Sequence, residues 1–234
     1  MTFFATRAQR LSAEAAGTAL LLATIVGSGL MADRLAGGNV AIALLANTLA
    51  TAAVLFVLIE TLGPISGAHF NPVVSLVAAW RGDLTRSEAA AYVVVQFAAA
   101  IAGVALAHAM FDARPLLAAA TKFRTGGGQL LSEFVATFGL VSVILILSSR
   151  GARSTGAAVA AWIAAAYWFT ASTSFANPAV TLARSLSDSF TGIRPADVPA
   201  FIVAQLLAAV VAVVVVERGL LARQAQPSKS GYVP

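Results

Sequence analysis

The segment FANPAVTLAR (175–184) repeats, 106 residues later, a pattern that first occurs as HFNPVVSLVA (69–78). Each copy places an Asn-Pro pair before a short apolar run. Asn favours the N-cap of a helix, and Pro favours its first turn because its missing N–H would be unpaired there. Asn71 and Asn177 are therefore predicted to cap helices that begin at Pro72 and Pro178. The apolar runs, about 71–79 and 177–187, are too short to cross a bilayer at about 1.5 Å per residue.

The composition is that of a membrane protein. Of the 234 residues, 59% are hydrophobic and 11% are charged, against about 25% charged in an average soluble domain. The net charge is +5, but the basic residues are scattered singly and form no groove with interleaved aromatics, so a nucleic-acid partner is not expected. The absence of Cys excludes disulfides and thiolate metal sites. The N-terminal residues lack a convincing cleavage site and are interpreted as part of a retained first helix.

Six further segments are apolar and near the ~20 residues that cross ~30 Å of hydrocarbon. They run at about 11–32, 40–62, 88–110, 130–149, 156–172 and 198–217. With the two short pieces, each half of the chain reads as span, span, half-span, span. The predicted fold is an all-α membrane protein with six transmembrane helices and two re-entrant half-helices.

Polar landmarks recur in the same order in both halves. Glu14 and Glu133 each precede a small residue and a Thr, and Gln96 and Gln205 lie in the last span of each half. Three crossings per half force the second half to run upside down, which makes an inverted repeat. The chain is therefore predicted to be a single transmembrane channel domain, 1–234, with repeats at about 10–111 and 129–217 and a cytoplasmic tail at 218–234.

Lys and Arg set the predicted orientation, because cytoplasmic loops carry an excess of positive charge. With the N-terminus inside, nine lie on the cytoplasmic side and six outside. The inner set is Arg7, Arg10, Arg81, Arg86, Arg150, Arg153, Arg218, Arg223 and Lys229, and the outer set is Arg34, Arg114, Lys122, Arg124, Arg184 and Arg194. We expect a multi-pass protein of the cell (inner) membrane with both termini cytoplasmic.

Inverted symmetry brings the starts of the two half-helices together at mid-membrane. Non-helical backbone at that depth is tolerated only where it is buried in protein or lines a wet cavity, and the loops 65–69 and 172–176 supply such backbone. The amide N–H groups of Asn71 and Asn177 are left to donate to a passing molecule, and both half-helix dipoles point their positive ends at the same place. This arrangement predicts a pore waist that repels cations and passes neutral hydroxylated molecules.

These motifs resemble the aquaporin and aquaglyceroporin (major intrinsic protein) family over about residues 10–217. The resemblance implies a homotetramer with one pore per subunit and passive flow of water or small neutral solutes through the lipid bilayer. It also implies that Glu14 and Glu133 are scaffold residues that hold the re-entrant loops. The pore waist would comprise Asn71, Pro72, Val73, Asn177, Pro178 and Ala179.

The sequence departs from the family pattern at two places. Val73 stands where Ala follows the first Asn-Pro, and Val180 stands where water and glycerol channels of the family usually carry Arg. Carried over by spacing, the family's selectivity filter would be Thr51, Ala165, Ser174 and Val180. This set has no charge, no His and no large aromatic, which favours solutes larger than water.

The Arg-less pattern resembles bacterial family members associated with arsenic resistance. We expect passage of metalloid acids such as arsenous acid, with methylated arsenicals, glycerol-like molecules and water as further solutes. A plain water or polyol channel is the alternative, and an ion-coupled secondary transporter is a third interpretation, although no paired carboxylates face the predicted pore. No nucleophile–base pair accompanies His69 and His108, so an enzyme is not expected, nor is any cofactor or metal.

Further polar residues have more than one interpretation. His69 is expected to line the cytoplasmic half of the pore, as a hydrogen-bonding residue or a pH gate. Arg184, one turn after Val180, either lines the outer vestibule and attracts oxyanions or pairs with the last carbonyls of its own helix or a lipid phosphate. Gln96 and Gln205 are expected to hydrogen-bond between helices. Glu60 precedes the first loop, with no assigned role.

Overall fold

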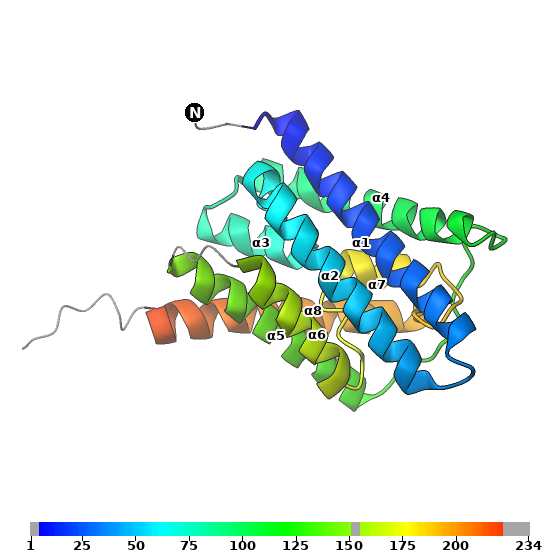
Figure 1. Ribbon diagram of the computed structural model, residues 1–234. Helices are drawn as coiled ribbons and strands as arrows, with labels where there is room; N and C mark the ends of the chain where they lie inside the picture. The colour runs from blue at the N-terminus through cyan, green and yellow to red at the C-terminus, as the bar shows by residue number, and fades with distance from the viewer. Residues whose placement is uncertain (1–4, 151–154, 222–234) are drawn as a thin grey trace, which may run out of the picture.

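The computed structural model describes residues 5–150 and 155–221, and its regular elements are helices (Figure 1). The helices are α1 (Arg7–Leu35), α2 (Val40–Ser66), α3 (Pro72–Arg81), α4 (Arg86–Met110), α5 (Gly127–Ser149), α6 (Thr155–Phe169), α7 (Pro178–Arg184) and α8 (Val198–Val213). A 3₁₀ turn, Pro195–Asp197, leads into α8, and a π-helical segment, Val214–Leu221, continues it.

The helix lengths confirm the predicted pattern of spans and half-spans. In the part of the chain that the structure describes, α1, α2, α4, α5 and the segment Pro195–Gly219 are long and apolar enough to cross a membrane. The described part of α6 has 15 residues and corresponds to the expected span at 156–172. With 10 and 7 residues, α3 and α7 can cross only part of a bilayer.

The two halves pack as two groups of helices around the half-helices. α1 contacts α2 and α4, α5 contacts α6 and α8, and α2 contacts α6 to join the groups. The half-helices α3 and α7 approach from opposite ends and meet in the middle (Figure 1). Close packing of α1 and α4 requires Gly103, because a Cβ there would collide with the Ala19 carbonyl oxygen.

The distribution of polar and apolar side chains is that of a protein embedded in a lipid bilayer. Large apolar side chains are exposed on the sides of the long helices, among them Leu49, Phe56, Val94, Val203 and Leu207. Buried polar residues include Glu14, Glu133, Gln96 and Gln205, which soluble proteins bury only when they are paired. The protein is therefore an integral membrane protein.

Two ion pairs gather helix ends at one face of the molecule. Arg10 at the start of α1 pairs with Glu88 at the start of α4, and Arg81 at the end of α3 pairs with Glu217 beyond α8. These ends carry residues of the predicted cytoplasmic set. Arg153, Arg223, Lys229 and most of the expected tail at 218–234 lie outside the described residues.

Candidate functional site

The Asn-Pro pairs begin the two half-helices as the sequence predicts. The Asn71 side-chain oxygen accepts from the Val73 N–H at 2.9 Å. The Asn177 oxygen accepts from the Ala179 N–H at 2.9 Å and the Val180 N–H at 3.3 Å. Pro72 and Pro178 occupy the first helical turn of α3 and α7. The predicted N-caps are confirmed.

The two Asn side chains also bond across the repeat. Asn71 Nδ2 donates to the Ala176 carbonyl and Asn177 Nδ2 donates to the Phe70 carbonyl, both at 2.8 Å. Each half-helix therefore holds the loop residue that precedes the other. An amide has two N–H groups, so each Asn keeps one N–H for the pore. The sequence predicted that both N–H groups of each Asn would be available to the pore. This expectation is wrong, because one N–H group of each Asn donates to a backbone carbonyl of the opposite loop.

Left-handed backbone in the loops follows the same symmetry. Gly67, Ala68 and Phe70 have φ of 87°, 51° and 47°, and the residues 106 positions later, Thr173, Ser174 and Ala176, have φ of 61°, 50° and 47°. Non-Gly residues adopt this region at a cost of about 1–3 kcal/mol each. Such strain indicates that the surrounding structure fixes the loops in a conformation that function requires.

Two buried carboxylates hold these loops in place. Glu14 accepts from the backbone N–H groups of His69 and Phe70 at 2.9 and 2.8 Å. Glu133 accepts from Phe175 and Ala176, both at 2.9 Å. With these N–H groups engaged, three loop carbonyls in each half have no donor among the described residues. They belong to Gly67, Ala68, His69, Thr173, Ser174 and Phe175.

The paired Gln residues tie each carboxylate to its half-helix. Gln96 Nε2 donates to Glu14 at 2.8 Å and to Ser75 Oγ at 3.0 Å. Gln205 Nε2 donates to Glu133 at 2.6 Å and to Thr181 Oγ1 at 2.9 Å. Both amides bond between helices, as the sequence predicts, and neither lines the cavity described next.

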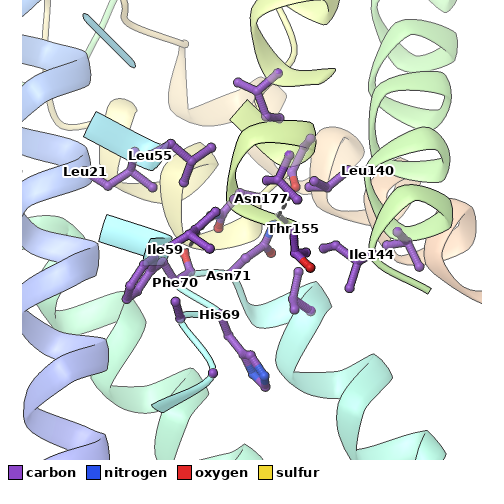
Figure 2. Close-up of a pocket in the computed structure, with 18 of the residues that line it drawn as sticks. Leu21, Leu55, Ile59, His69, Phe70, Asn71, Leu140, Ile144, Thr155 and Asn177 are labelled. Carbon is purple, nitrogen blue, oxygen red and sulfur yellow. Dashed lines mark hydrogen bonds between the residues drawn. The ribbon is translucent and has the colours of Figure 1, made fainter. Parts of the chain in front are cut away.

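A cavity of about 460 Å³ runs along the half-helix contact. Figure 2 shows Asn71 and Asn177 directed into its middle, with aliphatic walls formed by side chains such as Leu55 and Ile59 on one side and Leu140 on the other. The two loops contribute a polar backbone strip at residues 67–71 and 174–177. A polar strip along an otherwise apolar channel forms hydrogen bonds to only one side of a permeant molecule. The binding is therefore weak enough for the molecule to leave the channel again.

The end of the cavity on the predicted outer side agrees with three of the four predicted filter positions. Thr51, Ser174 and Val180 line it. Ala165 does not, because it lies exposed on the outer side of α6. The α6 contribution is Tyr167, which lines the cavity with its hydroxyl 3.4 Å from Thr51 Oγ1. The assignment of Ala165 and the expected absence of a large aromatic are therefore wrong.

The remaining residues of the predicted waist are buried in the protein and do not line the cavity. Val73 is fully buried in a cluster with Val141, Leu145 and Ala212, so its extra bulk packs against α5 and α8. Ala179 is also fully buried in the main core. Of the six predicted waist residues, only Asn71 and Asn177 line the cavity.

The other end of the cavity carries its ionisable side chains. His69 lines it, and its Nδ1 lies 3.1 Å from Ser75 Oγ. Glu60 lines it too, and a Cβ on Gly156 would lie 2.5 Å from its carboxylate oxygen. An acidic group beside the first turn of α6 complements the helix dipole. The sequence did not indicate that Glu60 lies beside α6.

Arg184 is buried and does not line the cavity. Its Nε donates to the Thr191 carbonyl and its Cζ lies 3.5 Å from the centre of the Phe175 ring. The interpretation that Arg184 lines the outer vestibule and attracts oxyanions is wrong, because its side chain is buried in the protein. The alternative is also inexact, because the accepting carbonyl belongs to Thr191 in the following loop and not to the end of its own helix. A second arginine that the sequence gave no reason to single out, Arg124, also lies against Phe175.

An inverted repeat of membrane helices, with two Asn-capped half-helices meeting at a cavity, defines a membrane channel. The comparisons agree. The model of the family described as Major intrinsic protein matches residues 4–171. The chain is 58% identical over 204 residues to Aquaglyceroporin AqpS of Rhizobium meliloti (strain 1021), covering 87% of each chain. It is 33% identical over 100 residues to Aquaporin-5 of Ovis aries, covering 41% of this chain and 37% of that one.

Among solved structures, the aquaglyceroporin from Plasmodium falciparum matches with a TM-score of 0.71 and 19% identity, over 93% of this chain and 98% of that one. This likeness supports the fold. The chain belongs to the major intrinsic protein family. It is a channel for water and small solutes rather than an enzyme.

Proposed function

We propose that the protein is a passive channel for neutral hydroxylated solutes larger than water, with metalloid acids such as arsenous acid as the substrates that its filter suits best. The single observation behind the proposal is that Val180 lines the cavity where a charged donor would otherwise narrow it. Glycerol-like molecules and water would pass by the same route. The relative named an aquaglyceroporin supports this class of solute.

The chemistry of the outer end suits molecules with several hydroxyl groups. Ser174 lines this end of the cavity, and its backbone carbonyl has no donor in the described chain, so it can accept a hydrogen bond from a solute. The hydroxyls of Thr51 and Tyr167 lie beside it on the cavity wall. Arsenous acid is neutral at pH 7 and presents three hydroxyls, which matches a wall with hydroxyl partners and no fixed charge.

The walls oppose charged solutes for a reason of solvation. The cavity is lined mainly by aliphatic side chains, and its charged lining residues, Glu60, Arg81 and Asp83, lie away from Val180. An ion entering this region would exchange its hydration for apolar wall at a large free-energy cost. A neutral polyhydroxylated solute loses less hydration free energy than an ion does. It recovers part of that loss through hydrogen bonds to the loop carbonyls and the Asn amides.

Stopped-flow measurements on one proteoliposome preparation test the proposal. Water, glycerol and arsenous acid should each enter at least tenfold faster than into empty liposomes, without saturation and independently of ion gradients. Water entry alone would establish the alternative of a plain water channel, and glycerol entry without arsenous acid would establish a polyol channel. Saturable uptake driven by an ion gradient would establish a secondary transporter.

We also propose that the protein is a homotetramer of the cell (inner) membrane with both termini cytoplasmic. The family resemblance supports the tetramer, and the excess of Lys and Arg supports the orientation. Native mass spectrometry from nanodiscs measures the number of subunits. Labelling of single cysteines introduced at Arg86 and Arg114 measures the sidedness, because only the position on the outer face of intact cells should react with an impermeant reagent.

A further inference from the structure

Two buried arginines converge on one aromatic residue at the outer end of the cavity. Arg124 comes from the connection 111–126 between α4 and α5, and Arg184 from the end of α7. Their Cζ atoms lie 4.8 and 3.5 Å from the centre of the Phe175 ring. Phe175 lines the cavity next to Ser174. Two guanidinium groups therefore lie against the side chain of a residue that lines the cavity, in the same cavity that Val180 lines without charge.

Backbone carbonyls fix both guanidinium groups. Arg124 donates from Nε to Gly192 at 2.9 Å and from Nη1 to Ser172 at 2.8 Å. Arg184 donates to Thr191, and its Nη1 is buried without a partner among the described residues. The two residues are 6% and 2% exposed. Hydrogen bonds to neutral carbonyls hold the groups in place but leave their charges uncancelled.

Carboxylates do not neutralise this pair. The four ion pairs found among the described residues include neither Arg124 nor Arg184. Asp197 pairs with Arg194 and also accepts from the backbone N–H of Arg124, and Glu133 accepts from Phe175, Ala176 and Gln205. Burial lowers the pKa of Arg124 to about 10, so this group stays protonated at neutral pH. Because Arg194 balances Asp197, the two arginines exceed the remaining buried carboxylate, Glu133, by one charge and leave a positive potential at the outer end of the pore.

We infer that Arg124 and Arg184 exclude cations from the pore in place of an arginine in the filter itself. This inference rests on the proposed function. A charge behind the pore wall repels a cation over several ångströms, because screening by water and salt is weak inside the protein. It occupies no lumen volume and offers no donors to the solute. The arrangement thereby separates two tasks, the rejection of cations by buried charge and the passage of bulky neutral solutes past Val180.

Neutral substitutions at the two positions test the inference in proteoliposomes. In Arg124→Gln/Arg184→Gln, we expect the influx of protons and Na⁺ to rise at least tenfold over the wild type, while glycerol influx stays within twofold. Gln keeps a donor for the carbonyls of Gly192 and Thr191. Arg124→Lys/Arg184→Lys retains the charges and should keep the cation influx low. Arg114→Gln removes one exposed charge from the same connection and should change neither flux.

A second pair of variants keeps both arginines and so decides the question if the Gln variants do not fold. Thr173 Oγ1 lies 3.5 Å from Arg124 Nη1. A carboxylate in Thr173→Glu would pair with Arg124 and cancel its charge, whereas Thr173→Gln has the same size and no charge. We expect a cation influx at least threefold higher in Thr173→Glu than in Thr173→Gln.

The inference is overturned by unchanged cation influx in the double Gln variant with intact glycerol flux, or by equal influx in the two Thr173 variants. Failure of the proposed function gives a different result. In that case the wild type itself would show no glycerol or arsenous acid flux above empty liposomes.

Discussion

The hydroxyl oxygens of Tyr167 and Thr51 lie 3.4 Å apart at the end of the cavity on the predicted outer side, where they join α6 to α2. Both residues are buried from lipid and line the pore. We propose that the filter consists of the hydroxyl groups of Thr51 and Tyr167, with Ser174 and the apolar Val180 completing the wall. In this proposed filter, Tyr167 is the large aromatic side chain, and its hydroxyl and that of Thr51 can both donate and accept.

Shortening Tyr167 should widen the filter. In Tyr167→Ala we expect influx of the four-carbon polyol erythritol to rise at least threefold, because the ring no longer occupies the cavity wall. Ala165→Leu is the matched control on the same helix, and its influx should equal that of the wild type because Ala165 faces outward. A larger effect at Ala165 than at Tyr167 would contradict this assignment. Light-scattering traces from proteoliposomes measure both.

An arginine at position 180 should restore a narrow filter. In Val180→Arg we expect glycerol and arsenous acid influx to fall at least tenfold while water influx falls less than threefold, because the guanidinium occupies the lumen and offers fixed donors. Val180→Leu controls for added bulk without charge and should reduce glycerol influx less than threefold. Equal losses in the two variants would show that size alone explains the effect.

The amide bonds between the halves should contribute to stability beyond helix capping. Asn177→Ala removes a cap, worth about 1 kcal/mol, and also leaves the buried Phe70 carbonyl without its donor, at about 1–3 kcal/mol. Asn39→Ala removes a cap of the same chemistry from α2, where the Asn oxygen accepts only from Ala41 and Ile42. Thermal unfolding in detergent should give a larger loss for Asn177→Ala. An equal loss of thermal stability in the two variants would show that the hydrogen bond from Asn177 to the Phe70 carbonyl adds no stability.

The carboxylate of Glu133 should be essential for the outer loop. Glu133→Gln keeps the shape of the side chain but replaces one carboxylate oxygen with an NH₂ group. In the wild type, the donors from Phe175, Ala176 and Gln205 face carboxylate oxygens, and in the variant one or more of them would face this NH₂ group. Hydrogen bonds to charged groups contribute about 1.5–3 kcal/mol each, so we expect a loss of at least about 3 kcal/mol and no solute flux. Glu60→Gln, at an exposed carboxylate, should cost less than about 1 kcal/mol. Thermal shifts of the two purified variants provide the comparison.

Acid should loosen the contact between the connection 111–126 and the loop after α7. Hydrogen bonds from the backbone N–H and the hydroxyl of Thr121 lower the pKa of Asp188 below its ordinary value of 3.8. Its stabilising contribution is fully present above that ordinary value and is lost as the pH falls through the lower folded value. Hydrogen exchange at the Thr121 amide should therefore accelerate below about pH 4, beyond the intrinsic change. In Asp188→Asn the additional acceleration should be absent.

Much of the site could be predicted because its signals are local. An Asn followed by Pro specifies the start of a helix through the chemistry of adjacent residues, and both caps form as expected. The matched acids and Gln residues indicated the symmetry, because a buried charge requires partners and the same partners recur in each half. The inverted repeat and the meeting of the half-helices follow from span count and length.

The identity of the pore-lining side chains and their contacts across the pore required the tertiary structure. These features depend on the rotation of each helix about its axis and on which residues lie opposite it. Two positions along a helix turn a side chain by about 200°, so counting back from Asn177 through an irregular loop selected Ala165 instead of Tyr167. Asn71 and Asn177 give one N–H each to the opposite loop only because the halves are in contact. Arg124 and Arg184 meet at Phe175 from segments far apart in the chain. The sequence by itself determined the helices, their caps and the symmetry, since neighbouring residues encode these; only tertiary packing decided which side chains face the pore.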